Sequence, residues 1–350
     1  MSDITREMTG PNPFEPVRAL CQRIARQVGT RVVGQQEAVE CVTAGLILGG
    51  HILMEGVPGV GKTLLARTLA DAVSLQFARV QFTPDLMPSD ILGTTMVQTT
   101  EGGGPRMTLQ PGPIFHHVVL ADEINRASPK TQSALLEAMQ ERQVSLGTTT
   151  HRLPSPFFVV ATQNPIDNEG TYPLPEAQLD RFLAKVLVRF PTEDEVMDIV
   201  ARTSTGEEAK VQKVADAETL VAAGETLRKL PVADHVARHA VRLVFATHPT
   251  HASAPACVKR FVKAGASPRA AQSLLGLARF HAVMDGRLHV ATEDVDRAAY
   301  PCLRHRVLLN FDALAEGVSP DALLRQLLLD VGPAAPAPKA SPGGTPARAR

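Results

Sequence analysis

The sequence has few aromatic residues and few cysteines. Among its 350 residues there is no tryptophan, and there are 2 tyrosines and 4 cysteines. The cysteines lie far apart, with no C-x-x-C pair, which argues against a disulfide framework and favours reduced thiols. No run of about 18 apolar residues is present, so no membrane span is expected. The amino-terminal residues also lack the apolar segment of a signal peptide, and we expect a cytoplasmic protein.

An excess of charge of either sign is also missing. The chain has 36 basic and 36 acidic residues. A protein dedicated to nucleic acid needs a basic surface to neutralise phosphates, so this balance makes nucleic acid an unlikely partner. Hydrophobic residues make up 44% and charged residues 21%, as in ordinary globular proteins. The length is sufficient for two domains, each with its own core.

The first half of the chain has the pattern of an α/β fold. Short apolar runs alternate with helical patterns, which predicts a parallel sheet flanked by helices. After Pro191 the pattern is that of helices only, with apolar residues recurring at helical spacing. The predicted strands are residues 51–55, 77–82, 117–121, 157–162 and 184–188. The predicted helical stripes are Val236, Ala240, Leu243 and Val244; Val295, Ala298, Ala299 and Cys302; and Leu323, Leu324, Leu327 and Leu328.

These patterns divide the chain into four parts. We expect a flexible arm at residues 1–16, an α/β core at 17–200 and an all-helical domain at 201–331. Residues 332–350 consist mainly of proline, alanine, glycine and serine and hold no bulky apolar side chain. Such a segment buries too little surface to offset the cost of ordering, so we expect it to be disordered.

Residues 56–63 match the phosphate-binding pattern G-x-x-x-x-G-K-[ST]. The glycines allow backbone N–H groups to point at phosphate oxygens at the start of a helix. Lys62 would neutralise the β- and γ-phosphates, and the Thr63 hydroxyl would bind Mg²⁺. A turn without chemical role is the alternative, but an apolar strand precedes the loop and a helix follows it. The residues expected to bind ATP here are Gly56, Val57, Pro58, Gly59, Val60, Gly61, Lys62, Thr63 and Leu64.

An acidic pair follows the third predicted strand. Asp122 would share Mg²⁺ with Thr63, and Glu123 would polarise the attacking water. Asn164 follows the next strand and could orient the same water. An acidic surface dipeptide and a turn-forming Asn-Pro are the simpler interpretations. The carboxyl ends of neighbouring parallel strands, however, are where open α/β sheets bind their ligands.

Several longer segments resemble the MoxR family of AAA+ ATPases, within the helix-2-insert clade. The resemblance spans roughly residues 20 to 310, in the order of the family. It implies an AAA+ P-loop core with a helical lid, and a ring, usually a hexamer, with ATP and Mg²⁺ at each subunit interface. The segments that carry it are residues 56–63, 122–127, 132–139, 161–165, 172–182 and 265–269.

The same resemblance assigns roles to individual residues. It makes Asn164 the first sensor, and Arg269 the second sensor, which the lid would offer to the nucleotide of its own subunit. Arg181 would be the arginine finger that reaches the γ-phosphate of a neighbour. Arg126 could act at the interface or simply pair with a nearby carboxylate. Val33 and Gly34 would line the adenine pocket.

Two glycine-containing segments predict β-hairpins, at residues 93–111 and 143–154. They could be passive surface turns, whereas in the resembling clade such hairpins face the ring pore or partners. Neither tip carries an aromatic residue. This favours remodelling of a bound partner over processive threading of a polypeptide.

The predicted function is therefore ATP hydrolysis that remodels or matures a partner protein. The resemblance suggests that the partner contains a von Willebrand factor A domain. Two alternatives remain open: a nucleic-acid-remodelling AAA+ motor, and the ATPase subunit of a metal chelatase.

Overall fold

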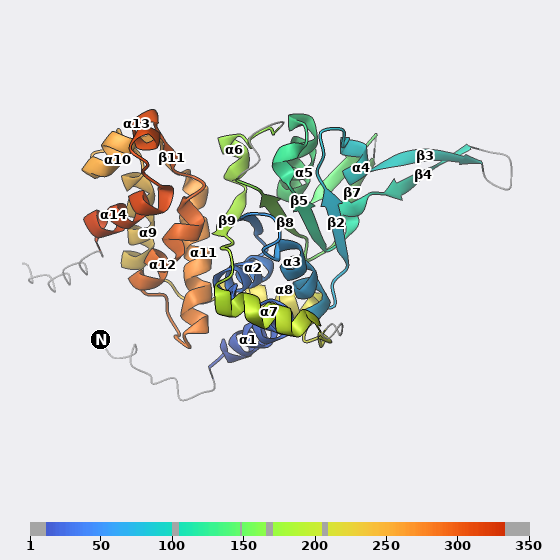
Figure 1. The fold of residues 1–350 in the computed structure, drawn as a ribbon, viewed down its shortest axis with the longest axis horizontal. Coiled ribbons are helices and arrows are strands. Elements are labelled where there is room, and N and C mark those ends of the chain that lie inside the picture. The colour runs from blue at the N-terminus through green and yellow to red at the C-terminus, as the bar shows by residue number, and fades with distance from the viewer. Residues whose placement is uncertain (1–11, 100–104, 148, 166–170, 205–208, 333–350) are drawn as a thin grey trace, which may run out of the picture.

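The structure is a computed structural model that describes residues 12–99, 105–147, 149–165, 171–204 and 209–332. Figure 1 shows a sheet with its helices in the centre, a group of helices on one side and a long hairpin that projects on the other. Within the described residues, no helix is long and apolar enough to cross a membrane.

The central sheet has five strands in the order β2-β5-β8-β1-β9, and every neighbouring pair is parallel. The buried strands are continuous apolar runs because helices cover both faces of the sheet. The predicted α/β fold class is confirmed, and each predicted strand lies within two residues of an observed one. The bounds are β1 (His51–Glu55), β2 (Phe77–Gln81), β5 (Val118–Asp122), β8 (Phe158–Gln163) and β9 (Phe182–Leu187).

Alternate residues of β1, β5 and β8 enter two different apolar cores. Ile52 and Met54 belong to the larger core, whereas Leu53, between them, belongs to the smaller one on the opposite face. The smaller core includes residues of α5, and the larger one continues without a break into the helices of the second group. The helices around the sheet are α1 (Glu15–Gly29), α2 (Gln36–Leu48), α3 (Lys62–Ala72), α5 (Pro129–Glu141), α7 (Glu193–Ser204) and α8 (Ala217–Arg228).

The carboxyl-terminal helices form the predicted lid, and all but one of the predicted apolar-stripe residues are buried in it; Leu328 is half-buried. The expectation of helices only after Pro191 is wrong in one detail. The strand β10 (Val262–Ala264) pairs antiparallel with β11 (Leu308–Leu309), and both are too short to show a strand period. The lid helices are α9 (Asp234–Ala246), α10 (Ala256–Phe261), α11 (Pro268–Met284), α12 (Thr292–Leu303), α13 (Phe311–Ala315) and α14 (Pro320–Val331).

The structure also changes two of the predicted boundaries. The arm predicted at residues 1–16 extends too far, because α1 already begins at Glu15 and residues 1–11 lie outside the described part. The predicted lid began at residue 201, yet α8 packs against α2 beside the sheet. A β-carbon at Gly224 of α8 would lie 2.3 Å from the carbonyl oxygen of Ile47. Apart from Gly332, the predicted tail at 332–350 lies outside the described residues.

Both predicted hairpins are present. The longer one pairs β3 (Gly93–Thr99) with β4 (Pro105–Pro111), between the short helix α4 (Pro88–Leu92) and the turn η1 (Pro113–Phe115). The shorter one pairs β6 (Gln143–Leu146) with β7 (Thr149–Arg152). Residues 100–104 and 148, at the two tips, lie outside the described part. The stem of the longer hairpin projects from the body (Figure 1) and exposes three large apolar side chains, Met96, Val97 and Met107.

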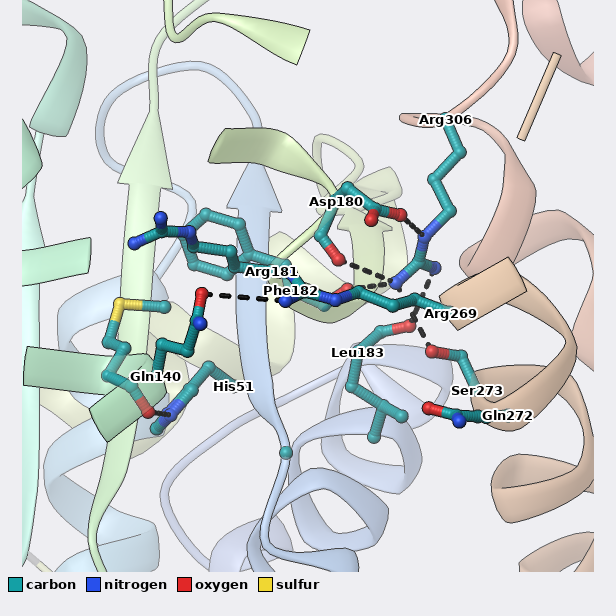
Figure 2. Close-up of a pocket in the computed structure, with 12 residues that line it drawn as sticks. His51, Gln140, Asp180, Arg181, Phe182, Leu183, Arg269, Gln272, Ser273 and Arg306 are labelled. Carbon is teal, nitrogen blue, oxygen red and sulfur yellow. Dashed lines mark hydrogen bonds and ion pairs between the residues drawn. The ribbon is translucent and has the colours of Figure 1, made fainter. Parts of the chain in front are cut away.

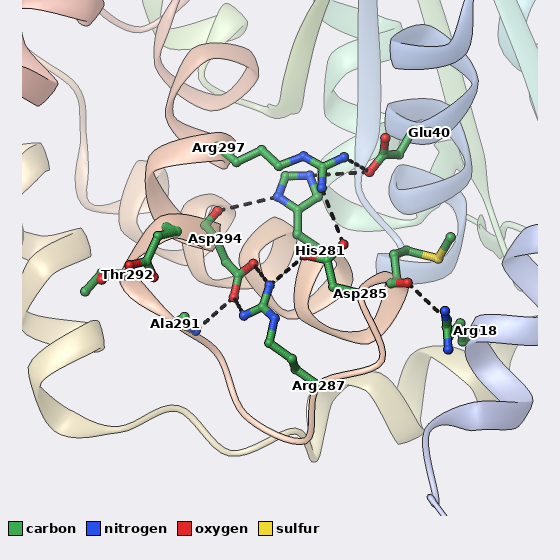
Figure 3. Close-up of polar contacts among 11 residues, drawn as sticks. Arg18, Glu40, His281, Asp285, Arg287, Ala291, Thr292, Asp294 and Arg297 are labelled. Carbon is green, nitrogen blue, oxygen red and sulfur yellow. Dashed lines mark hydrogen bonds and ion pairs between the residues drawn. The ribbon is translucent and has the colours of Figure 1, made fainter.

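A polar network joins the lid to the sheet domain (Figure 3). Glu40 of α2 accepts a hydrogen bond from Arg297 of α12 at 2.7 Å, and His281 Nε2 of α11 lies 3.8 Å from the same carboxylate. Burial raises the pKa of Glu40. Burial, followed by the charge of Arg297, lowers the pKa of His281 to about 4. The lid is therefore held to α2 by polar contacts as well as by the shared apolar core.

His51, at the start of β1, is a second buried imidazole. Its Nδ1 accepts from the Val159 backbone N–H at 3.0 Å, and its Nε2 lies 3.1 Å from the Met139 carbonyl. This pairing fixes the neutral ring with its proton on Nε2. Burial lowers the pKa of His51 to about 4.

These buried histidines predict that the free energy of unfolding falls between pH 6.5 and about 4. The unfolded chain takes up protons first, because the pKa values of folded His51 and His281 lie near 4 instead of 6.5. The contribution of these histidines to the free energy of unfolding is fully present above pH 6.5. It is lost as the pH falls, by up to about 3 kcal/mol for His51 alone. Thermal unfolding measured across this range checks the prediction. His51→Gln should make the free energy of unfolding depend less steeply on pH, whereas a substitution of the exposed His235 by Gln should not. A free energy of unfolding that does not change between pH 6.5 and 4 would contradict the prediction.

Candidate nucleotide-binding site

The phosphate-binding loop joins the end of β1 to the start of α3. Gly59 and Gly61 have φ values of +82° and +86°, a conformation that favours glycine. At Gly56 the end of β9 comes so close that a β-carbon would lie 2.5 Å from the Val188 carbonyl oxygen. Lys62 donates from its Nζ to the Gly56 carbonyl. The glycines thus have the conformational and steric roles that a backbone cradle for phosphate requires.

The acidic pair lies beside this loop. Asp122 is the last residue of β5 and is 7% exposed, and the Thr63 hydroxyl lies 3.4 Å from its Oδ2. Glu123 adopts a left-handed conformation with φ of +55°, which is uncommon for a residue with a side chain. Its backbone N–H donates to Thr162 Oγ1 at 2.9 Å, which holds this turn in place. Strained backbone of this kind is frequent at functional sites.

Three residues around the acidic pair were missed by the sequence analysis. Thr162 Oγ1 donates to Asp122 Oδ1 at 2.6 Å, and the Arg79 guanidinium donates to Oδ2 at 2.8 and 3.0 Å. Gln81 Nε2 donates to Glu123 Oε2 at 2.9 Å. Arg79 and Gln81 are two residues apart on β2, so they lie on the same face of the sheet. Two polar residues at that spacing within a predicted strand were the available signal.

The donor atoms at this position fit Mg²⁺. Thr63 offers a hydroxyl and Asp122 a buried carboxylate, and Mg²⁺ binds oxygen ligands of this kind. Both carboxylate oxygens of Asp122 accept hydrogen bonds, Oδ1 from Thr162 and Oδ2 from Arg79, and Oδ2 is the oxygen that lies beside the Thr63 hydroxyl. Arg79 contacts the same oxygen and would share it. Thr63 and Asp122 are thus suited to hold the ion together with the phosphates.

Asn164 lies at the same edge of the sheet. It follows Gln163, the last residue of β8, and is 6% exposed. The Gly56 N–H donates to the Gln163 carbonyl at 3.3 Å, so Asn164 borders the phosphate loop. Of the two interpretations of Arg126, the structure shows the local ion pair, with Nη1 2.8 Å from Glu123 Oε2.

A separate cavity of about 160 Å³ adjoins the phosphate loop, and its lining does not include Gly34. Val33 is part of its wall, and the carbonyl of Gly34 accepts from Arg189 Nη2 at 2.8 Å. Hydrogen bonds from Arg189 lower the pKa of Glu195 to about 2. Gly34 has φ of +72°, and a β-carbon there would lie 2.2 Å from the Glu195 carboxylate. The lining includes Val32, Val33, Gly59, Val60, Gly61, Leu64, Pro191 and Ile199.

Arg181 lies at the opposite edge of the sheet from this site. It directly precedes β9, whose first residue Phe182 pairs with His51 at the amino end of β1. The phosphate loop follows Glu55 at the other end of this five-residue strand, which at 3.3 Å per residue is about 13 Å long. Arg181 and the phosphate loop of the same chain therefore lie at opposite ends of the parallel strands.

Arg269 is in the first turn of α11 and lines the same cavity as Arg181, of about 290 Å³. Figure 2 shows it reaching toward Gln140, whose Oε1 lies 3.5 Å from Arg269 Nη2. In this structure Arg269 lies beside Arg181, and the expectation that it serves the nucleotide of its own subunit stays a prediction. The lid packs beside the amino end of β9, which places α11 with Arg181 instead of with the phosphate loop.

Comparison with known proteins agrees with this geometry. Residues 51–184 match the ATPase family associated with various cellular activities (AAA), and residues 255–327 match the AAA lid domain. Chaperone MoxR1 of Mycobacterium tuberculosis is 43% identical over 316 residues, which cover 89% of this chain and 81% of that protein. The chain belongs to the MoxR family of AAA+ ATPases. Protein MoxR of Methylorubrum extorquens is 31% identical over 309 residues, which cover 83% of this chain and 88% of that protein.

Solved structures support the membership in the MoxR family. A crystal structure of a Cytophaga hutchinsonii protein superposes with a TM-score of 0.84 at 38% identity, over 91% of this chain and 96% of that one. The AAA match contains the phosphate loop, the acidic pair and Arg181, and the lid match contains Arg269. These candidate residues thus lie within segments that match the AAA family and lid models.

Proposed function

We propose that this MoxR-family ATPase hydrolyses Mg²⁺-ATP at sites shared between neighbouring copies in a ring. The observation that carries the proposal is the separation of the site into two halves. The phosphate loop, Asp122 and Glu123 lie at one edge of the sheet, and Arg181 with Arg269 at the other. A head-to-tail contact brings the two edges together, and closure of such contacts gives a ring. A hexamer is the ring size that the family suggests.

Each residue then has a defined task. Lys62 and the loop N–H groups would hold the phosphates, and Thr63 and Asp122 would hold Mg²⁺, which would supply positive charge next to the phosphates. Glu123 polarises the attacking water, and Asn164 orients it. Arg181 and Arg269 of the neighbour stabilise the charge that develops on the transferred phosphoryl group, for which planar, permanently charged guanidinium groups are suited.

The client is proposed to be a protein, and one with a von Willebrand factor A domain in particular. A relative bears the name chaperone, and the projecting β3–β4 hairpin exposes Met96, Val97 and Met107. Exposed methionines suit adaptable contacts with apolar protein surfaces. This favours a chaperone-like role in the cytoplasm over the nucleic-acid motor and the chelatase subunit.

Glu123→Gln tests the proposal. This variant should bind ATP normally but hydrolyse it at least about 100-fold more slowly, because the water loses its polarising carboxylate. The exposed Glu141→Gln is the matched control and should retain activity. With ATP bound, the Glu123→Gln protein should sediment as a closed ring and retain its partner for mass spectrometry. Normal turnover would remove Glu123 from its role, and a monomer in every nucleotide state would refute the shared site.

A further inference from the structure

Arg306 is a buried arginine between the lid and the sheet. It follows α12, and its side chain is only 2% exposed. Figure 2 shows its guanidinium directed at the residues around Arg181. It donates to the carbonyl oxygens of Asp180 and Leu183, each at 3.2 Å, and of Phe182 at 2.5 Å. Its Nε also donates to Asp180 Oδ1 at 2.8 Å.

These acceptors lie on both sides of Arg181 in the chain. The backbone that carries Arg181 is therefore held before and after it by one guanidinium, while the Arg181 side chain lines the cavity. A buried arginine can offer five donors in a fixed plane, and leaving them unpaired would be costly. The position of Arg181 is thus set by a rigid group of the lid.

The same network extends to Arg269. Ser267, the N-cap of α11, donates from Oγ to Asp180 Oδ2 at 2.8 Å and accepts from the Arg269 N–H at 3.1 Å. Asp180 therefore accepts from Arg306 through one oxygen and from Ser267 through the other. A chain of hydrogen bonds through Ser267 thus joins Asp180, the residue before Arg181, to the backbone N–H of Arg269 on the lid.

We propose that Arg306 and Asp180 are positioning residues that hold Arg181 and Arg269 as one rigid pair, directed at the nucleotide of the neighbouring subunit. This inference rests on the proposed shared site. Because the pair is fixed, both arginines approach and leave the neighbour's phosphates together. A displacement of about 1 Å at such a group can cost about 100-fold in rate.

The chain offers a matched control for a purely structural role. Arg304, two residues earlier, is also buried and joins the lid to the sheet. It donates to the Lys185 carbonyl at 3.1 Å and to both oxygens of Asp321 at 3.0 Å. None of these contacts involves residues 180–183. Asp321→Asn therefore disturbs a comparable ion pair without releasing Arg181.

The test compares Asp180→Asn with Asp321→Asn in the full-length assembled protein. Asp180→Asn should leave ATP affinity and KM nearly unchanged, since its own phosphate loop is intact, and should lower kcat about 10- to 100-fold. Asp321→Asn should lower Tm by about as much as Asp180→Asn does, but its kcat should stay within about twofold of that of the parent. Ser267→Ala, which keeps the buried ion pair, should lower kcat several-fold by releasing Arg269, and it serves if Asp180→Asn fails to fold.

Mixed rings separate a positioning role from a general defect. Asp180→Asn subunits retain a complete loop edge, and Glu123→Gln subunits retain a complete arginine edge, so their mixture should recover part of the activity. If Asp180→Asn and Ser267→Ala both keep the kcat of the parent while Arg181→Ala is inactive, the positioning role is refuted. The proposed shared site is unaffected by that result. An active Arg181→Ala would instead overturn the shared site itself. If Asp180→Asn and Asp321→Asn lower kcat equally, the hydrogen bonds of Asp180 contribute to stability only, and the positioning role is refuted.

Discussion

Arg181→Ala is expected to lower the kcat of ATP hydrolysis by about 10³-fold or more, although Arg181 lies at the far edge of the sheet from its own phosphate loop. An arginine supplied by a neighbour contributes about 10³–10⁵ to phosphoryl-transfer rates, because it neutralises charge present only in the transition state. ATP affinity should change little, since the loop of the variant is intact. Steady-state phosphate release and the binding of a fluorescent nucleotide measure the two effects separately.

Rings assembled from two different variants test this prediction most directly. Arg181→Ala and Glu123→Gln subunits are each nearly inactive alone, but a mixed ring contains interfaces that join an intact loop to an intact arginine. Partial recovery of activity in such rings is expected. Arg152→Ala is the control, because this exposed arginine lies on the second hairpin and outside the site. Failure to recover in rings shown to contain both subunits would count against action across the interface.

Lys62→Ala is expected to remove nucleotide binding. The loop N–H groups alone cannot neutralise the β- and γ-phosphates, and the loss of a charge-assisted contact there should weaken ATP binding by at least about 100-fold. ATP should raise the Tm of the parent protein but not that of the variant, because only a ligand that binds the folded state stabilises it. Lys130→Ala, an exposed lysine on α5, is the control. Unchanged ATP affinity in Lys62→Ala would contradict the assignment of the loop.

The sequence was sufficient for the parts of the site that are set by local chemistry. The apolar run before Asp122 and the run before Asn164 predicted two neighbouring parallel strands, and β5 and β8 do pair in parallel. Both hairpins were found because their glycines and alternation are short-range signals. Thr162 was missed because a threonine in a buried strand looks like an ordinary β-branched residue.

Long-range packing could not be predicted in the same way. The side of the sheet on which the lid lies depends on contacts such as those of α12 with β9, which no local pattern encodes. That Arg269 lies in one cavity with Arg181 therefore had no signal in the sequence. Arg306 likewise gave no signal, since its partners at residues 180–183 are more than 120 positions away.

The apolar core that continues from the sheet into the lid has a consequence for how the protein unfolds. Ile52 of β1 and Leu274 of α11 belong to the same buried cluster. Detaching the lid would expose apolar surface on both sides, at about 25 cal/mol for each Å². Heat or denaturant should therefore melt the two parts in a single cooperative transition. A destabilising change anywhere in the lid then lowers the amount of intact phosphate loop in the cell.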